Sequence, residues 1–252
     1  MGRRAESFGA EASAYERFRP GYPHALVDEV LGYAGRPVRT ALEIGAGTGK
    51  ATRAFTSRGI AVTASDPDAE MLAELVRRVP EVAATTVAPL EEIPLDRTYD
   101  LVFAAAALHW TRPEGRWDRI GALLGSAGVF ASFGGPTRLA DAELGEAVRV
   151  ARAPFLASDD VPSPDGSADD DPMQWPGTEL RDEPSFGDVR RSVIERRMRM
   201  PAADYVGLLS TISAYLVLAE ATRQAAFAAI LQVLPDEVDV VADITVHLAR
   251  RL

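Results

Sequence analysis

The first half of the chain alternates between two spacings of apolar residues. Short apolar runs typical of buried strands occupy positions 39–44, 60–65, 83–87, 100–106 and 128–133. Segments with helical spacing lie at 50–58, 69–78 and 114–124, and a loop at 88–94 precedes the fourth strand. This alternation predicts the α/β class: a Rossmann-like, mostly parallel sheet with helices on both faces.

The second half of the chain is less regular. Its pattern predicts a helix over 139–155, a loop rich in Pro and Asp over 157–184 and strand-like alternation over 189–200. Helices over 202–213 and 220–234 and a last strand over 239–248 follow. We therefore expect one domain over 1–252, made of a cofactor-binding core (8–134), a C-terminal helical lid insertion for the substrate (135–235) and a final strand (236–252).

Composition and charge narrow the function. The chain has 47% hydrophobic residues, no cysteine and a net charge of −10. The lack of cysteine excludes disulfides, thiol nucleophiles and zinc–cysteine sites, and the acidic balance argues against a nucleic-acid or anionic-membrane surface. The longest apolar run, 101–108, is too short to span a bilayer. We expect a cytoplasmic protein, without nucleic-acid or membrane partners. Six aspartates lie between 159 and 171, but their spacing does not fit a calcium loop, so no metal site is predicted.

The segment 45–49, Gly-Ala-Gly-Thr-Gly, directly follows the first strand. Glycines allow a sharp turn and a close approach of the backbone to a ligand, which then meets free N–H groups of the next helix. A Walker phosphate loop would need glycine at 44 and Ser or Thr at 51, where Ile44 and Ala51 stand. A dinucleotide loop would need its third glycine at 50, where Lys50 stands.

Two acidic residues lie at the ends of the first two predicted strands, next to this segment in the expected fold. Glu43 precedes the glycines, where it would repel a pyrophosphate but favour an ammonium or sulfonium group. Asp66 ends the second strand, the place from which an acid accepts the hydroxyls of an adenosine ribose. Together the two acids favour a cofactor site over a purely structural turn.

Residues 42–49 and 65–72 together resemble the class I S-adenosylmethionine-dependent methyltransferases. Segments 90–94 and 99–103 resemble the adenine-side loop and fourth strand of that family, and segments 15–23 and 108–110 resemble its small-molecule branch, which includes trans-aconitate methyltransferases. The resemblance covers about residues 8–134. It implies S-adenosyl-L-methionine as cofactor and methyl transfer (EC 2.1.1.-) to a small-molecule acceptor, with O- or N-methylation favoured and a carboxylate or natural-product acceptor also compatible.

The resemblance also implies roles for single residues. Glu43 and the glycine segment would hold the methionine end of the cofactor, Asp66 the ribose, and Ala104 would lie near the amino group. Met71 and the Leu90 backbone would face the adenine, while Tyr15 and Arg19 would close over the cofactor and meet its carboxylate. The implied cofactor-binding set is Tyr15, Arg19, Glu43, Gly45, Ala46, Gly47, Thr48, Gly49, Asp66, Pro67, Met71, Leu90, Glu91 and Ala104. Pro89 stands where many relatives have an aspartate, and proline offers neither an N–H nor a carboxylate for that adenine contact.

The acceptor side has fewer signals. His109 follows the fourth strand at the edge where ligands gather, and its ordinary pKa suits a catalytic general base. It equally suits a histidine that only orients Trp110 or a loop carbonyl. Trp110, Trp175 and Tyr215 are candidates to line the acceptor pocket, although aromatic residues at such positions also serve as core.

Two other functions share part of this pattern. A nicotinamide-dependent oxidoreductase would also begin with strand, glycine loop and helix, but Glu43 disfavours a pyrophosphate, and a chain whose only lysine is Lys50 has no Tyr-x-x-x-Lys pair. A cofactor-binding regulatory protein without transferase activity is the other alternative. The sequence leaves the acceptor, the attacked atom and the oligomeric state open.

Overall fold

The computed structural model describes residues 12–159, 163–166 and 171–252. The start of the predicted core at 8–11 and three aspartates of the acidic loop (Asp160, Asp169 and Asp170) lie outside the described residues.

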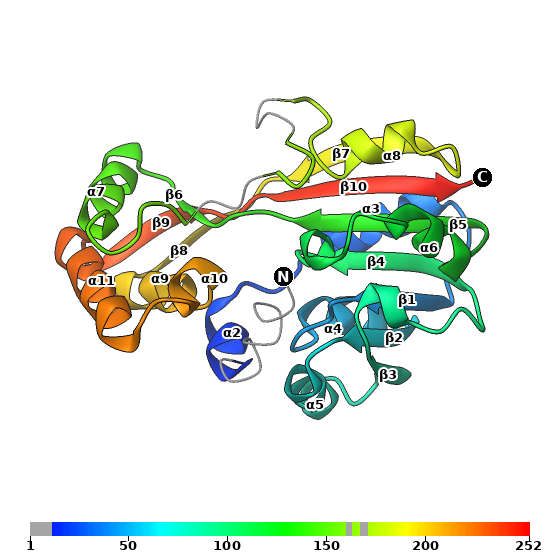
Figure 1. Ribbon diagram of the computed structural model, residues 1–252, viewed down its shortest axis with the longest axis horizontal. Coiled ribbons are helices and arrows are strands. Elements are labelled where there is room, and N and C mark those ends of the chain that lie inside the picture. Colours follow the sequence, from blue (N-terminus) through cyan, green and yellow to red (C-terminus); the bar gives the residue numbers. More distant parts are fainter. Residues whose placement is uncertain (1–11, 160–162, 167–170) are drawn as a thin grey trace.

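A seven-stranded sheet forms the larger part of the molecule, at the right of Figure 1. Its strand order is β3-β2-β1-β4-β5-β10-β7, and β1 to β5 are parallel, as βα crossovers require. Strand β10 runs antiparallel between β5 and β7. The bounds are β1 Thr40–Ile44, β2 Ala61–Asp66, β3 Ala84–Val87, β4 Tyr99–Ala105, β5 Leu124–Gly134, β7 Phe186–Ile194 and β10 Ile244–Arg251. The predicted Rossmann-like α/β fold is confirmed.

Helices cover both faces of this sheet because alternate strand residues are apolar on each side. One face packs against α3 (His24–Ala34), α4 (Lys50–Thr56) and α5 (Ala69–Arg78), where Phe55 of α4 stacks on Phe103 at 4.4 Å between ring centroids. The other face packs against α6 (Arg116–Leu123), α8 (Gly177–Asp182) and the short 3-10 helix η2 (Leu90–Glu92). A second short 3-10 helix, η3 (Leu108–Trp110), follows β4.

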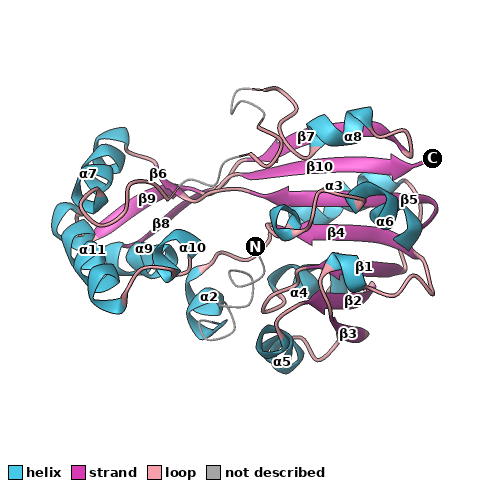
Figure 2. Ribbon diagram, viewed as in Figure 1, coloured by secondary structure: helices cyan, strands magenta, loops and turns pink. Residues whose placement is uncertain are grey.

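A smaller antiparallel sheet, at the left of Figure 1, has the order β6-β9-β8 (Figure 2). Its strands are β6 Arg138–Leu139, β9 Glu237–Val241 and β8 Arg197–Pro201. It packs with α7 (Ala142–Arg152), α9 (Ala202–Leu209), α10 (Ser213–Leu216) and α11 (Glu220–Val233) around a separate apolar core. We call this part the small lobe and the seven-stranded part the large lobe. Helix α2 (Ala12–Phe18) lies between the two (Figure 1).

Three stretches of chain connect the sheets, at 135–137, 195–196 and 242–243, and we call them the crossings. The predicted single strand over 189–200 is therefore two strands, β7 and β8, in different sheets, and the predicted last strand over 239–248 is likewise β9 and β10. Alternation continues through the crossings at 195–196 and 242–243, so alternation alone does not reveal the change of sheet there.

The predicted boundaries of the lid insertion differ from the two lobes that the sheets define. Helix α8 and strand β7 fall inside 135–235 but belong to the large lobe, and β9 falls inside 236–252 but belongs to the small lobe. Helix α8 also occupies part of the predicted loop over 157–184. Within the part of the chain that the structure describes, no helix has the length and apolarity that crossing a membrane requires.

Candidate cofactor-binding site

The glycine segment turns at the carboxyl end of β1 and leads into α4. Gly45, Gly47 and Gly49 all have positive φ angles, of 65°, 54° and 87°. A Cβ on Gly45 would lie 2.5 Å from the Ala107 Cβ, and a Cβ on Gly49 would lie 2.7 Å from Leu75 Cγ. A Cβ on Gly47 would meet nothing within 4 Å. Two glycines therefore serve the packing of the turn, and the middle one borders the space that a ligand would occupy.

Asp66 fixes this turn from the neighbouring strand. Its Oδ2 accepts a hydrogen bond from the Gly47 N–H at 2.9 Å, and its Oδ1 accepts one from the Asp68 N–H at 2.9 Å. The cap of helix α5 is Asp68, whose side chain accepts hydrogen bonds from the N–H groups of Glu70 and Met71. The carboxylate of Asp66 is thus held against the glycine segment, and burial raises its pKa.

Glu43 lies at the end of β1 with 1% of its surface exposed. It accepts a hydrogen bond of 2.5 Å from the Thr52 hydroxyl of α4. Burial, with a smaller contribution from the charge of Asp66, raises the pKa of Glu43 to about 8. Its carboxyl group is mostly protonated at neutral pH, and a cationic group beside it would favour the ionised form.

A cavity opens at this edge of the sheet, and both lobes contribute to it. Six of the residues predicted to bind the cofactor line it: Tyr15, Arg19, Glu43, Gly45, Ala46 and Gly47. The opposite wall comes from all three crossings, with Gly135, Arg196 and Asp243. Sequence reasoning missed Arg196 and Asp243, because they lie far from the glycine segment in the chain and carry no local motif.

Polar contacts tie Arg196 to another crossing and to the segment that follows α2. The Arg196 N–H donates to Asp243 Oδ1 at 2.7 Å, and Arg196 Nη1 donates to the Gly21 carbonyl at 2.6 Å. A Cβ at Gly135 would overlap the Asp243 carbonyl oxygen, so the crossings pass one another at backbone contact.

The remaining predicted cofactor residues lie around this cavity rather than on its wall. Leu90 and Glu91 line a second, open hollow together with residues of α6, and the Arg112 N–H donates to Glu91 Oε1. Met71 and Ala104 are buried, Pro67 is half-buried, and Thr48 is 1% exposed and donates to Glu16. Gly49 packs against α5.

His109 lies in η3 beside Trp110, with 4.7 Å between the ring centroids. Burial and, to a lesser extent, the positive charges of Arg116 and Arg19 lower the pKa of His109 to about 4. The imidazole is neutral at neutral pH, as a base must be, but it is a weaker base than its ordinary pKa suggested. Neither ring is part of the cavity wall given above, and the roles of His109 and Trp110 stay predictions.

The other two predicted acceptor residues pack against apolar clusters. Tyr215 is fully buried in the small lobe, where its ring packs 5.3 Å from that of Phe227 and its hydroxyl donates to Asp159. Trp175 packs against the apolar cluster under α6 and α8, with the Arg116 guanidinium 5.2 Å from its ring centroid. Neither ring is part of the cavity wall given above, and the roles of Trp175 and Tyr215 in an acceptor pocket stay predictions.

Fold and site together define a doubly wound α/β protein with a cavity at the carboxyl ends of its parallel strands, the edge where ligands bind in such folds. Residues 42–132 match the family described as "Methyltransferase domain". An uncharacterized methyltransferase of Mycobacterium tuberculosis is 45% identical over 108 residues, which are 42% of this chain and 43% of that protein. A candidate S-adenosylmethionine-dependent methyltransferase of Saccharomyces cerevisiae is 31% identical over 48% of this chain and 44% of its own length. The matched segment thus spans less than half of these curated relatives.

Solved structures extend the similarity beyond the matched segment. A candidate type II methyltransferase of Anaeromyxobacter dehalogenans has a TM-score of 0.70 and 27% identity, over 92% of this chain and 98% of that one. Phosphoethanolamine N-methyltransferase 2 of Haemonchus contortus, at 16% identity, has a TM-score of 0.55 over 98% of this chain and 60% of that one, and shows the fold alone. Residues 42–132 therefore match a methyltransferase domain, and the fold over most of the chain is similar to that of a methyltransferase.

Proposed function

We propose that this protein transfers the methyl group of S-adenosylmethionine to a small-molecule acceptor, and that it belongs with the branch that includes trans-aconitate methyltransferases. The single observation that carries the proposal is the arrangement around Gly47. A buried acid suited to a cationic group, Glu43, and a fixed acid suited to ribose hydroxyls, Asp66, flank a glycine whose missing side chain opens toward the cavity.

The hydrogen-bonding and charged groups of this chain match those of the cofactor. Glu43 would accept hydrogen bonds from the ammonium of the methionine part, and Asp66 from the ribose hydroxyls. Arg19 would pair with the carboxylate, and Tyr15 would cover it from α2. The bound cofactor supplies an electrophilic methyl group on a positively charged sulfur. The protein has then to align the acceptor with that methyl group and to exclude water.

In this proposal the crossings form the part of the cavity that binds the methyl acceptor. Arg196 lines the cavity opposite the glycine segment and offers a guanidinium to an anionic group of the acceptor. A hydroxyl or amine acceptor must lose a proton, and His109 is the candidate base, although its low pKa limits it to acceptors that lose the proton readily. A carboxylate acceptor needs no base.

The test is transfer of labelled methyl from S-adenosylmethionine to a panel of small hydroxyl, amine and carboxylate compounds. The proposal expects labelled product with at least one compound, and loss of product in Asp66→Ala. For a hydroxyl or amine acceptor, His109→Ala should lower kcat by about a hundredfold if His109 is the base, the usual effect of general-base catalysis. No transfer to any compound by a protein that binds the cofactor would favour the regulatory alternative.

A further inference from the structure

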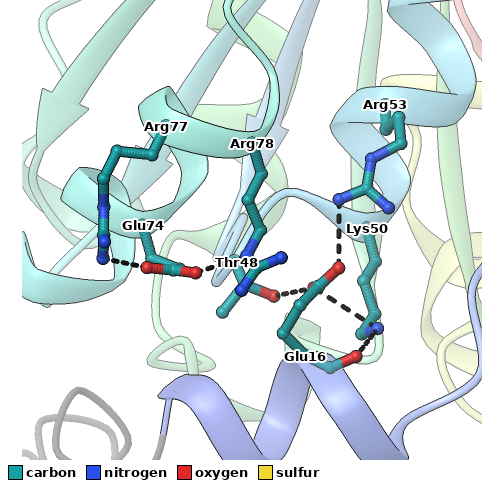
Figure 3. Close-up of polar contacts among 7 residues, drawn as sticks. All are labelled: Glu16, Thr48, Lys50, Arg53, Glu74, Arg77 and Arg78. Carbon is teal, nitrogen blue, oxygen red and sulfur yellow. Dashed lines mark hydrogen bonds and ion pairs between the residues drawn. The ribbon is translucent and has the colours of Figure 1, made fainter.

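The Glu16 side chain of helix α2 contacts the glycine segment, and Figure 3 shows it with its partners. Its carboxylate accepts a hydrogen bond from the Thr48 hydroxyl at 2.9 Å and from Arg53 Nη2 at 3.0 Å. Lys50 Nζ lies 3.3 Å from the same carboxylate and donates to the Glu16 carbonyl at 2.6 Å. One acid of α2 is thus bound by three residues of the glycine segment and the helix that follows it.

This cluster is shielded from water. The side chains of Glu16 and Lys50 are only 11% and 10% exposed, whereas that of Arg53 is 49% exposed. Burial would raise the pKa of Glu16, but the hydrogen bonds from Arg53 and Thr48 and the charge of Lys50 bring it below its usual value, so Glu16 is ionised at neutral pH. Removal of the charge would leave the Lys50 ammonium buried without its carboxylate, which costs far more than the loss of a surface ion pair.

The other end of α2 is anchored to the small lobe. A Cβ at Gly207 of α9 would overlap the Phe18 ring, so the ring lies directly on that helix. Beyond the helix, Arg19 Nε donates to the Thr211 hydroxyl at 2.8 Å. Tyr15 and Arg19, which line the cavity, flank Glu16 in the chain. The contacts of Glu16 therefore act on the segment of chain that brings both residues to the cavity.

We infer that Glu16 is a positioning residue of the cofactor site: it holds α2 on the glycine segment so that Tyr15 and Arg19 cover the bound cofactor. This inference rests on the proposed function. It also gives a role to Lys50, the only lysine of the chain, as one of the residues that hold Glu16 in place. Glu16 contacts the residues that surround the cofactor and acts through α2, not on the reacting atoms.

The test compares Glu16→Gln with Glu74→Gln, using S-adenosylhomocysteine as the ligand. Glu74 is a matched control because it is also a buried acid bound by two arginines, but its partners, Arg77 and Arg78, lie with it on α5 (Figure 3). We expect Glu16→Gln to raise the Kd at least about tenfold, mainly through faster dissociation, as for the loss of a buried charge partner. Glu74→Gln should keep the wild-type Kd. Equal Kd values for both variants would overturn the inference.

A mutant cycle with Arg19 separates positioning from a general loss of structure. If Glu16 acts by placing Arg19, then Arg19→Ala should weaken binding in the wild type but add little in the Glu16→Gln background. Additive effects would contradict the inference. Should Glu16→Gln fail to fold, Arg53→Met is the second variant. It removes one hydrogen-bond donor to Glu16 at a half-exposed position and should still speed the dissociation of S-adenosylhomocysteine. A wild type that does not bind S-adenosylhomocysteine would instead overturn the proposed function.

Discussion

At the scale of single residues, the three glycines of the turn have different reasons to be glycine. All three were predicted as cofactor residues from the motif, and the motif does not distinguish them. The structure does, because a side chain at Gly49 would collide with Leu75, whereas one at Gly47 would point into open space beside Asp66. Packing thus explains the glycine at 49, and access for a ligand explains the glycine at 47.

Replacement by alanine should separate these two reasons. Both positions have positive φ, which costs an alanine about 1 kcal/mol, and Gly49→Ala adds an overpacking cost of about 1–3 kcal/mol. We expect Gly49→Ala to lower Tm more than Gly47→Ala, and Gly47→Ala to lower the affinity for S-adenosylhomocysteine more, relative to its effect on Tm. Thermal unfolding and calorimetry measure both quantities. The reverse order would contradict the assignment.

The raised pKa of Glu43 gives a second residue-scale prediction. In the free protein the carboxyl group has a pKa of about 8 and is mostly protonated at pH 7. A cationic ammonium beside it lowers that pKa, so binding should release a proton, and affinity should rise with pH until about pH 8. Calorimetry at pH 7 in buffers of different ionisation enthalpy measures the release. Glu43→Gln should abolish it, and a wild type without proton release would show that no cation binds next to Glu43.

At the scale of elements, agreement between sequence and structure depends on local signals. Helix α5 begins and ends where the sequence predicts, because Asp68 caps it and amphipathic spacing defines its length. The strands on either side of the crossings at 195–196 and 242–243 were predicted as single elements, because nothing in an alternating pattern marks the residue where the chain changes sheet. Helix α8 was missed inside a polar loop, since a helix of six residues has too few turns for a spacing signal.

The cap of α5 is open to a direct test. Asp68→Ala removes an acceptor for the N–H groups of Glu70 and Met71, and should lower the free energy of unfolding by about 1 kcal/mol. Asp68→Asn should keep most of that stability, because asparagine caps nearly as well. Urea unfolding measures both, and equal losses in the two variants would show that the charge of Asp68, rather than the cap, is what stabilises α5.

At the scale of the whole molecule, the sequence predicts the position of some site residues, and only tertiary packing brings in the others. The glycine segment, Glu43 and Asp66 are close in sequence or follow adjacent strands, and their proximity was predictable from topology. Arg196 and Asp243 reach the cavity because three crossings meet there, and that depends on how the two sheets join. The contacts of Trp175 and Tyr215 with apolar clusters are equally non-local, so the sequence alone could not place these two rings relative to the cavity.

Two glycine replacements should have opposite effects on stability, because Gly135 lies at the close contact between crossings and Gly145 does not. Gly135→Ala would force a side chain onto the Asp243 carbonyl and should destabilise the protein by about 1–3 kcal/mol. Gly145 lies within α7 with free space around it, so Gly145→Ala should stabilise the protein by about 0.5–1 kcal/mol through helix propensity. Thermal unfolding compares the two. A neutral Gly135→Ala would contradict backbone contact at the crossings.

The central claim is that the cavity between the glycine segment and the crossings holds S-adenosylmethionine. Calorimetric titration of the purified protein with S-adenosylhomocysteine, and separately with NAD⁺, tests it most directly. The account predicts saturable micromolar binding of S-adenosylhomocysteine that Asp66→Ala abolishes, and no binding of NAD⁺. Binding of NAD⁺ without binding of S-adenosylhomocysteine would contradict the account and favour an oxidoreductase.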